Sequence, residues 1–174
     1  MTFALVLIQN IPILRGIMFG IAQILGGIVA AAITSALFPG PLTVRTSLGG
    51  GTSVVRGLFI EMFLTTFLIV TVLFLAIEKQ RATFLAPVAL GLAQFVAMLA
   101  GTYFTGASLN PARSFGPCVA LASFQGYHWI YWVGPGLGAI VAVVFYGLMK
   151  MLDYETADVG QHGPEVEMEN ETLS

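Results

Sequence analysis

Four stretches of about twenty residues, each with no more than one charged side chain, constrain this chain more than any other feature. They cover residues 16–38, 58–77, 84–103 and 129–149. A helix needs about 20 residues to cross the hydrocarbon core of a bilayer. Because backbone polar groups in lipid must be satisfied within the segment, each stretch is predicted to be a helix and not a strand. We therefore expect an all-α, multi-pass membrane protein with four spanning helices.

The composition excludes several other classes of protein. Hydrophobic residues make up 57% of the chain and charged residues 9%, against about 45–50% and about 25% in soluble proteins. The net charge of −2 provides no basic surface for a nucleic acid. The single cysteine, Cys118, excludes an internal disulfide framework and a multi-cysteine metal cluster. We expect no cofactor, no metal, no nucleic-acid partner and no enzymatic activity.

The charged residues are divided sharply along the chain. Residues 1–152 hold all seven bases and two acids, whereas 153–174 hold the other seven acids and no base. So polar a segment cannot bury enough surface to offset its chain entropy, and we predict a disordered acidic tail. A regulatory tail with a phosphorylation site is the alternative.

The orientation in the membrane follows from the positions of the bases. With four crossings, both chain ends and the 78–83 loop share one face, which holds four bases: Arg15, Lys79, Arg81 and Lys150. The other face holds Arg45 and Arg56, together with Arg113 if the 104–128 connection is counted. The positive-inside rule therefore predicts that the first face, with the C-terminus, is cytoplasmic.

The first and last stretches resemble each other at an offset of 112 residues, since 25–30 is matched by 137–142. Small residues recur every fourth position in both and predict close helix packing: Ala22, Gly26 and Ala30, and Gly134, Gly138 and Ala142. The two stretches cross in opposite directions, so the repeat is inverted, as in many transport folds. Chance similarity between membrane helices is the alternative.

The connection 104–128 begins and ends on the same face and contains a short apolar helix. Asn110 is a good N-cap and Pro111 a good first residue for a helix that extends to about Ser123. It is too short to span, so we predict a re-entrant half-helix. Non-helical backbone at 106–109 is tolerated at membrane depth only when it is buried in protein or lines a wet cavity. Asn110 and Arg113 are expected there; an ordinary cap and a snorkelling arginine are the alternatives.

The segment 106–117, GASLNPARSFGP, resembles the second signature loop of the aquaporin (major intrinsic protein) family, and HWIYWVGP at 128–135 resembles the start of its last helix. The resemblance covers about residues 1–152 and is greatest to fungal members. It implies an aquaporin-like inverted-repeat helical bundle. The family has six crossings and two half-helices that each open with Asn-Pro-Ala. This chain has four crossings and one such motif, so an N-terminally truncated bundle is expected, with 2–9 as the remnant of the first half-helix.

The resemblance implies a passive channel for water, with small neutral solutes such as glycerol as further permeants. Glu61 and Gln23 match buried polar residues that hold the pore loop, although a proton relay and a helix–helix hydrogen bond are their respective alternatives. Ala107 and Met98 match positions that face the constriction at Arg113, and Met98 stands where water-selective members usually have histidine. The residues implied to form the pore and its selectivity filter are Asn110, Pro111, Ala112, Arg113, Ala107, Met98, Gly106, Ser108 and Leu109.

The resemblance also implies partners and a location. The expected partners are the lipid bilayer, water as permeant, and copies of the chain in a homotetramer or full-length relatives in a mixed assembly. The plasma membrane is the expected location. A truncated subunit that interacts with full-length aquaporins without conducting is the alternative function, and a transporter unrelated to aquaporins is a third.

Overall fold

The computed structural model describes residues 1–78 and 83–152, and the parts of the chain that it describes contain helices and loops but no strand. The helices run in the order α1 (Thr2–Leu7), α2 (Ile13–Leu37), α3 (Val54–Val72) with a π-helical turn (Leu73–Ile77), a 3-10 turn (Thr83–Leu85) before α4 (Ala86–Thr105), α5 (Pro111–Ala120) and α6 (Ile130–Met151). Four of them are long and apolar enough to cross a membrane. The predicted all-α membrane fold is confirmed. The acidic tail, Lys79 and Arg81 lie outside the described residues.

Two of the spanning helices begin earlier than the apolar stretches that predicted them. Helix α2 begins at Ile13 instead of residue 16, and α3 begins at Val54 instead of residue 58. The added turns contain Arg15 and Arg56, both exposed. A helix continues for as long as its backbone is hydrogen-bonded, and a long basic side chain at its end can extend its charge into water. Hydropathy alone therefore underestimates the length of a helix that ends in such a residue.

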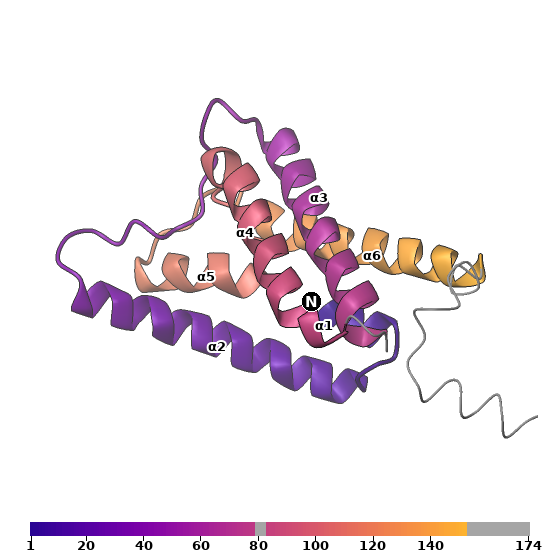
Figure 1. Ribbon diagram of the computed structural model, residues 1–174. Helices are drawn as coiled ribbons and strands as arrows, with labels where there is room; N and C mark the ends of the chain where they lie inside the picture. The colour runs from indigo at the N-terminus through magenta and orange to yellow at the C-terminus, as the bar shows by residue number, and fades with distance from the viewer. Residues whose placement is uncertain (79–82, 153–174) are drawn as a thin grey trace, which may run out of the picture.

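Helices α3 and α6 cross closely at the centre of the bundle (Figure 1), because α6 presents glycine there. A Cβ added at Gly134 would lie 2.8 Å from the Cβ of Glu61, and one added at Gly138 would lie 2.9 Å from the Cβ of Thr65. Ala142, one turn further on, is also buried. The small-residue stripe of α6 is thus a contact between helix backbones, as the sequence predicts.

The matching stripe on α2 behaves differently. Helix α2 packs against α5, but Ala22, Gly26 and Ala30 are exposed, and a Cβ added at Gly26 would meet nothing within 4 Å. The expectation of close packing at this stripe is therefore wrong for the residues that the structure describes. Gly134 and Gly138 of α6 face α3, whereas the described chain places no helix in the corresponding position beside α2 (Figure 1).

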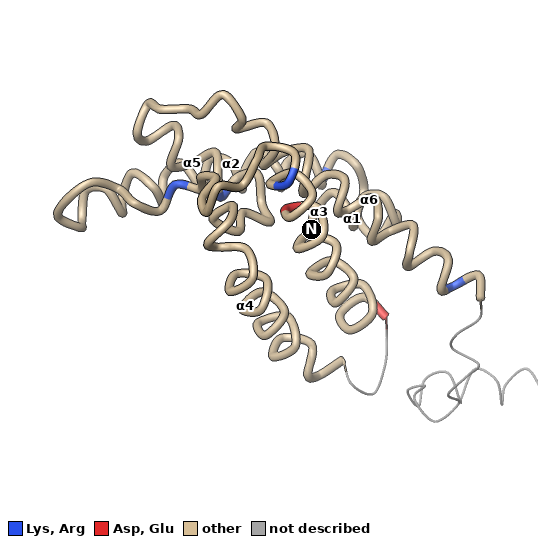
Figure 2. Tube along the Cα trace, turned by 90° about the horizontal axis from the view of Figure 1, so that it is seen from above, with Lys and Arg blue, Asp and Glu red and all other residues tan. Residues whose placement is uncertain are grey.

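Charged residues are sparse along the described part of the trace (Figure 2). At the end of α3, Glu78 forms an ion pair with Lys150 of α6 and accepts a hydrogen bond of 3.4 Å from the Tyr146 hydroxyl. The opposite end of the bundle carries the connections 38–53 and 106–129, and we call it the loop end. These two ends bracket the apolar length of the helices.

Candidate functional site

Helix α5 is a short half-helix with well-formed ends. Asn110 has an extended backbone, and its Oδ1 accepts a hydrogen bond of 3.0 Å from the Ala112 N–H, so it is the N-cap before Pro111. At the other end, the N–H of Ser123 donates to the Cys118 carbonyl at 3.0 Å, and Ala122 has a positive φ of 46°. This is a Schellman-type C-terminus. It ends α5 at Ala120, three residues before the limit predicted from the sequence.

The loop before α5 has an unusual backbone that Glu61 holds in place. Ala107 and Leu109 have φ angles of 45° and 52°, a region that residues other than glycine seldom adopt. The two carboxylate oxygens of Glu61 accept hydrogen bonds of 2.8 Å from the Ser108 N–H and 2.9 Å from the Leu109 N–H. Glu61 is fully buried. Both of its oxygens therefore fix the loop, which offsets the conformational cost of the left-handed residues.

A chain of hydroxyl groups supports the same loop from behind. The Thr46 hydroxyl donates to Ser114 Oγ at 2.7 Å, Ser114 Oγ contacts Ser108 Oγ, and Ser108 donates to the Asn110 carbonyl at 2.9 Å. All three hydroxyl-bearing residues are buried. Nothing in the sequence singles out Thr46, because its partner Ser114 is 68 residues away. Sequence reasoning missed this link for that reason.

A cavity of about 830 Å³ opens at the N-terminus of α5, with walls from α1, α2, α3, α4, α6 and the loop. It brings together Gln23 and six consecutive residues of the predicted pore set: Ser108, Leu109, Asn110, Pro111, Ala112 and Arg113. Thr65 on α3 and Gln94 on α4 add polar groups to the lining. The sequence did not point to these two, because an isolated threonine or glutamine in an apolar helix carries no specific signal.

Three residues of the predicted pore set, Gly106, Ala107 and Met98, do not line this cavity. Ala107 is fully buried and packs with Met98 in an apolar cluster between α3 and α4. A Cβ added at Gly101 of α4 would lie 3.0 Å from the Cβ of Ala107. The expectation that Ala107 and Met98 face the opening is therefore wrong for this structure, because the left-handed loop turns the Ala107 methyl toward α4.

Arg113 and Thr65 each bring a polar atom that the protein leaves unsatisfied. Arg113 Nη1 and Thr65 Oγ1 are buried and have no hydrogen-bond partner among the described residues. Buried polar groups nearly always have a partner, and ordered water provides it where protein does not. Both residues line the cavity, so ordered water in the cavity is the partner that remains.

Gln23 lines the cavity without contacting the loop. Its Nε2 donates a hydrogen bond of 2.8 Å to the Thr2 hydroxyl of α1. The expectation that Gln23 holds the loop backbone is wrong, and the alternative of a bond between helices is observed. The carboxylate of Glu61 reaches the loop from the central helix α3, whereas Gln23 lies on α2 next to α1.

The described residues thus form a bundle of membrane-capable helices with one half-helix whose N-terminus opens into a cavity. The chain belongs to the major intrinsic protein family, whose model matches residues 1–146. It is similar to aquaporin-7 of Botryotinia fuckeliana, with 61% identity over 92% of this chain and 35% of the relative. It is also similar to a probable aquaporin-5 of Gibberella zeae, with 52% identity over 95% of this chain and 30% of the relative.

The fold is shared with a solved structure of the aquaglyceroporin from Plasmodium falciparum. The TM-score is 0.69 and the sequence identity 22%, over 83% of this chain and 68% of that one. At this identity the likeness shows the fold alone. The chain spans about a third of the length of the two curated relatives named above.

Proposed function

We propose that the chain forms one side of a passive, water-conducting pore, in which Asn110 and Arg113 face the permeant. The observation that carries the proposal is the cavity at the N-terminus of α5. The Asn110 Oδ1 caps the helix, whereas its Nδ2 has no acceptor among the described residues, so both amide hydrogens are available to a water oxygen. The unpartnered Arg113 Nη1 is a second donor beside it.

The same groups favour a neutral permeant over a cation. The N-terminus of α5 carries a partial positive charge, and the Arg113 guanidinium adds a full one, so cations and hydronium are repelled. In a trans peptide the carbonyl points opposite to the N–H. Because the amides of Ser108 and Leu109 point to Glu61, the carbonyl of Ser108, which lines the cavity, points away from Glu61 and acts as an acceptor for water.

The volume of the cavity favours a second candidate function. A volume of about 830 Å³ is large for a file of single water molecules, and α2 leaves its small-residue stripe exposed beside it. In this second candidate, the chain alone does not conduct. It conducts only when a further segment closes the wall of the cavity, and that segment comes from another copy in a homotetramer or from a full-length relative. We propose that the C-terminus is cytoplasmic, because four bases lie on that face. The plasma membrane is the proposed location on the family resemblance alone.

Osmotic shrinkage of proteoliposomes tests both candidates. The chain is reconstituted alone and together with the N-terminal half of a fungal aquaporin. At least one of the two preparations is expected to pass water faster than empty vesicles. Changing Asn110 to Ala is expected to lower that rate. Arg113→Ala is expected to admit cations, and Arg15→Ala, at an exposed base outside the cavity, to leave shrinkage unchanged. Shrinkage equal to empty vesicles in both preparations would overturn the proposal.

A further inference from the structure

The wall of the pore cavity that α3 and α4 supply carries two polar side chains that the proposed function does not use. Thr65, Leu68 and Ile69 line the cavity from α3, and Gln94 is the residue of α4 that lines it. Gln94 is partly buried and has no hydrogen-bond partner among the described residues. Leu68 and Ile69 are apolar, so Thr65 and Gln94 supply the side-chain hydrogen-bonding groups of this wall.

Thr65 differs from the other threonines of α2, α3 and α4. Each of the others donates a hydrogen bond to the carbonyl four residues earlier in its own helix, and these are Thr34, Thr66, Thr71, Thr102 and Thr105. A hydroxyl within a helix commonly forms this local bond. Thr65 Oγ1 is buried and bonds to no described residue. Its hydroxyl is therefore available to a molecule in the cavity.

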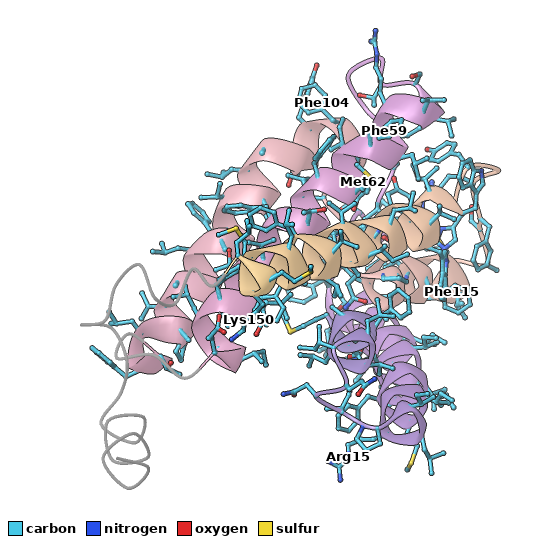
Figure 3. The ribbon with its side chains drawn as sticks, turned by 90° about the vertical axis from the view of Figure 1, so that its right-hand side faces the viewer. Arg15, Phe59, Met62, Phe104, Phe115 and Lys150 are labelled. Atoms are coloured by element: carbon cyan, nitrogen blue, oxygen red, sulfur yellow. The ribbon has the colours of Figure 1, made fainter. Side chains whose placement is uncertain are left out.

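The two side chains lie within about one helical turn of the same depth. Helices α3 and α4 pack against each other, and Phe59 and Phe104 lie near the same end of the pair, the loop end (Figure 3). Thr65 is six residues along from Phe59, and Gln94 is ten residues before Phe104. These separations are about 9 Å and about 15 Å at 1.5 Å per helical residue. Both side chains therefore lie well inside the spanning length, on adjoining helices.

Threonine and glutamine add what Asn110 and Arg113 lack. The Asn110 Nδ2 and the Arg113 guanidinium only donate, whereas a hydroxyl and the oxygen of a side-chain amide also accept. A solute hydroxyl loses its bonds to bulk water on entry, and leaving it unpaired costs free energy. A permeating water molecule keeps other water molecules as neighbours, but a larger solute displaces them and depends on the wall. Gln94 and Thr65 therefore matter more for a solute with several hydroxyl groups than for water.

We propose that Gln94, assisted by Thr65, determines whether the pore admits a small polyol. The inference rests on the proposed function of the chain as one side of a pore. The Gln94 Oε1 accepts a hydrogen bond from a hydroxyl group of the solute, and the cavity of about 830 Å³ has room for a molecule larger than water. An apolar side chain at position 94 leaves that hydroxyl without this acceptor and raises the barrier to the polyol, while water continues to pass.

Proteoliposomes test the assignment with glycerol as the probe. Water permeation is measured by shrinkage in an impermeant osmolyte, and glycerol permeation by the re-swelling that follows in a glycerol gradient. Gln94→Met keeps the size of the side chain and removes its amide, so glycerol permeation is expected to fall about fivefold, the effect of one net hydrogen bond, with water permeation unchanged. Thr65→Val is expected to act in the same direction. Thr102→Val removes a hydroxyl of α4 that lies outside the cavity and is the matched control.

The outcomes separate this inference from the proposed function. The chain is measured alone and together with the N-terminal half of a fungal aquaporin, and circular dichroism verifies that each variant is folded. An absence of water permeation in both preparations overturns the proposed function and this inference together. Water permeation without glycerol permeation in the wild type, or a glycerol-to-water ratio that Gln94→Met leaves unchanged, overturns this inference alone. It is also overturned if Thr102→Val lowers the ratio as much as Gln94→Met.

Discussion

Glu61 on the central helix accepts a hydrogen bond of 2.9 Å from the backbone N–H of Leu109, which lies 48 residues further along the chain. The other oxygen of Glu61 accepts from Ser108. One buried side chain thus sets the position of the non-helical segment that leads into the half-helix. The proposed pore depends on this relationship, because Asn110 and Arg113 follow directly after the loop.

Replacing Glu61 with glutamine should weaken the fold. Glutamine offers one acceptor oxygen in place of two, so either the Ser108 or the Leu109 N–H loses its partner. A buried donor left unsatisfied costs about 1–3 kcal/mol, and more when a charged partner is lost. Thermal unfolding followed by circular dichroism should show a lower midpoint. Thr71→Val is the matched control on the same helix, since the Thr71 hydroxyl bonds only its own helix, at the Phe67 carbonyl. An unfolding midpoint for Glu61→Gln equal to that of the wild type would show that the loop does not depend on the carboxylate.

The two stripes of small residues should differ in their tolerance of a methyl group. Gly138→Ala places a Cβ 2.9 Å from the Cβ of Thr65, so α3 and α6 must separate, at a cost of about 1–3 kcal/mol. Gly26→Ala, at the repeat-related position, adds a Cβ with nothing within 4 Å and should be neutral or slightly stabilising through helix propensity. Unfolding of the chain alone checks both variants. Equal destabilisation would mean that the stripe of α2 has a helix partner.

Removing the Ser114 hydroxyl should destabilise the connection between residues 38–53 and the half-helix. In Ser114→Ala, the buried Thr46 hydroxyl loses the acceptor that it contacts at 2.7 Å, and an unsatisfied buried hydroxyl costs about 1–3 kcal/mol. Hydrogen exchange should then accelerate at residues 43–49. Thr102→Val serves as the control, because the exposed Thr102 hydroxyl bonds only its own helix, at Met98. No change in exchange at 43–49 would contradict the link.

Acidification should loosen the loop end through His128. Burial lowers the pKa of His128 below its ordinary value of about 6.5, and its Nδ1 lies 3.6 Å from the buried Cys118 Sγ. The unfolded chain therefore takes up the proton first, so stability is full above about pH 6.5 and is lost as the pH falls toward the lowered pKa.

Melting midpoints measured between pH 7.5 and 5 check this dependence. The fall in the midpoint should be smaller in His128→Gln and unchanged in His162→Gln, which alters the other histidine of the chain. A wild-type midpoint that is constant over this range, or an equal effect of both substitutions, would contradict the assignment to His128.

The amino-acid sequence by itself determined the four spanning helices and the start of the half-helix. These features depend on contacts within a few residues of each other. A helix is hydrogen-bonded between residues four apart, and the Asn110 cap reaches only Ala112. Apolar runs, an N-cap and a following proline are local signals, so they can be read from the order of residues. The limits of α2 and α3 were less accurate, because a helix can continue past the last apolar residue.

Only the tertiary structure decided which polar groups meet. Thr46 reaches Ser114 across 68 residues, and Gln23 contacts Thr2 in place of the loop before α5. It also decided that equivalent stripes have different surroundings, because Gly138 lies against α3 whereas Gly26 is exposed. The physical reason is that close packing and buried hydrogen bonds depend on the residue across the interface, and the position of that residue is set by the path of the whole chain.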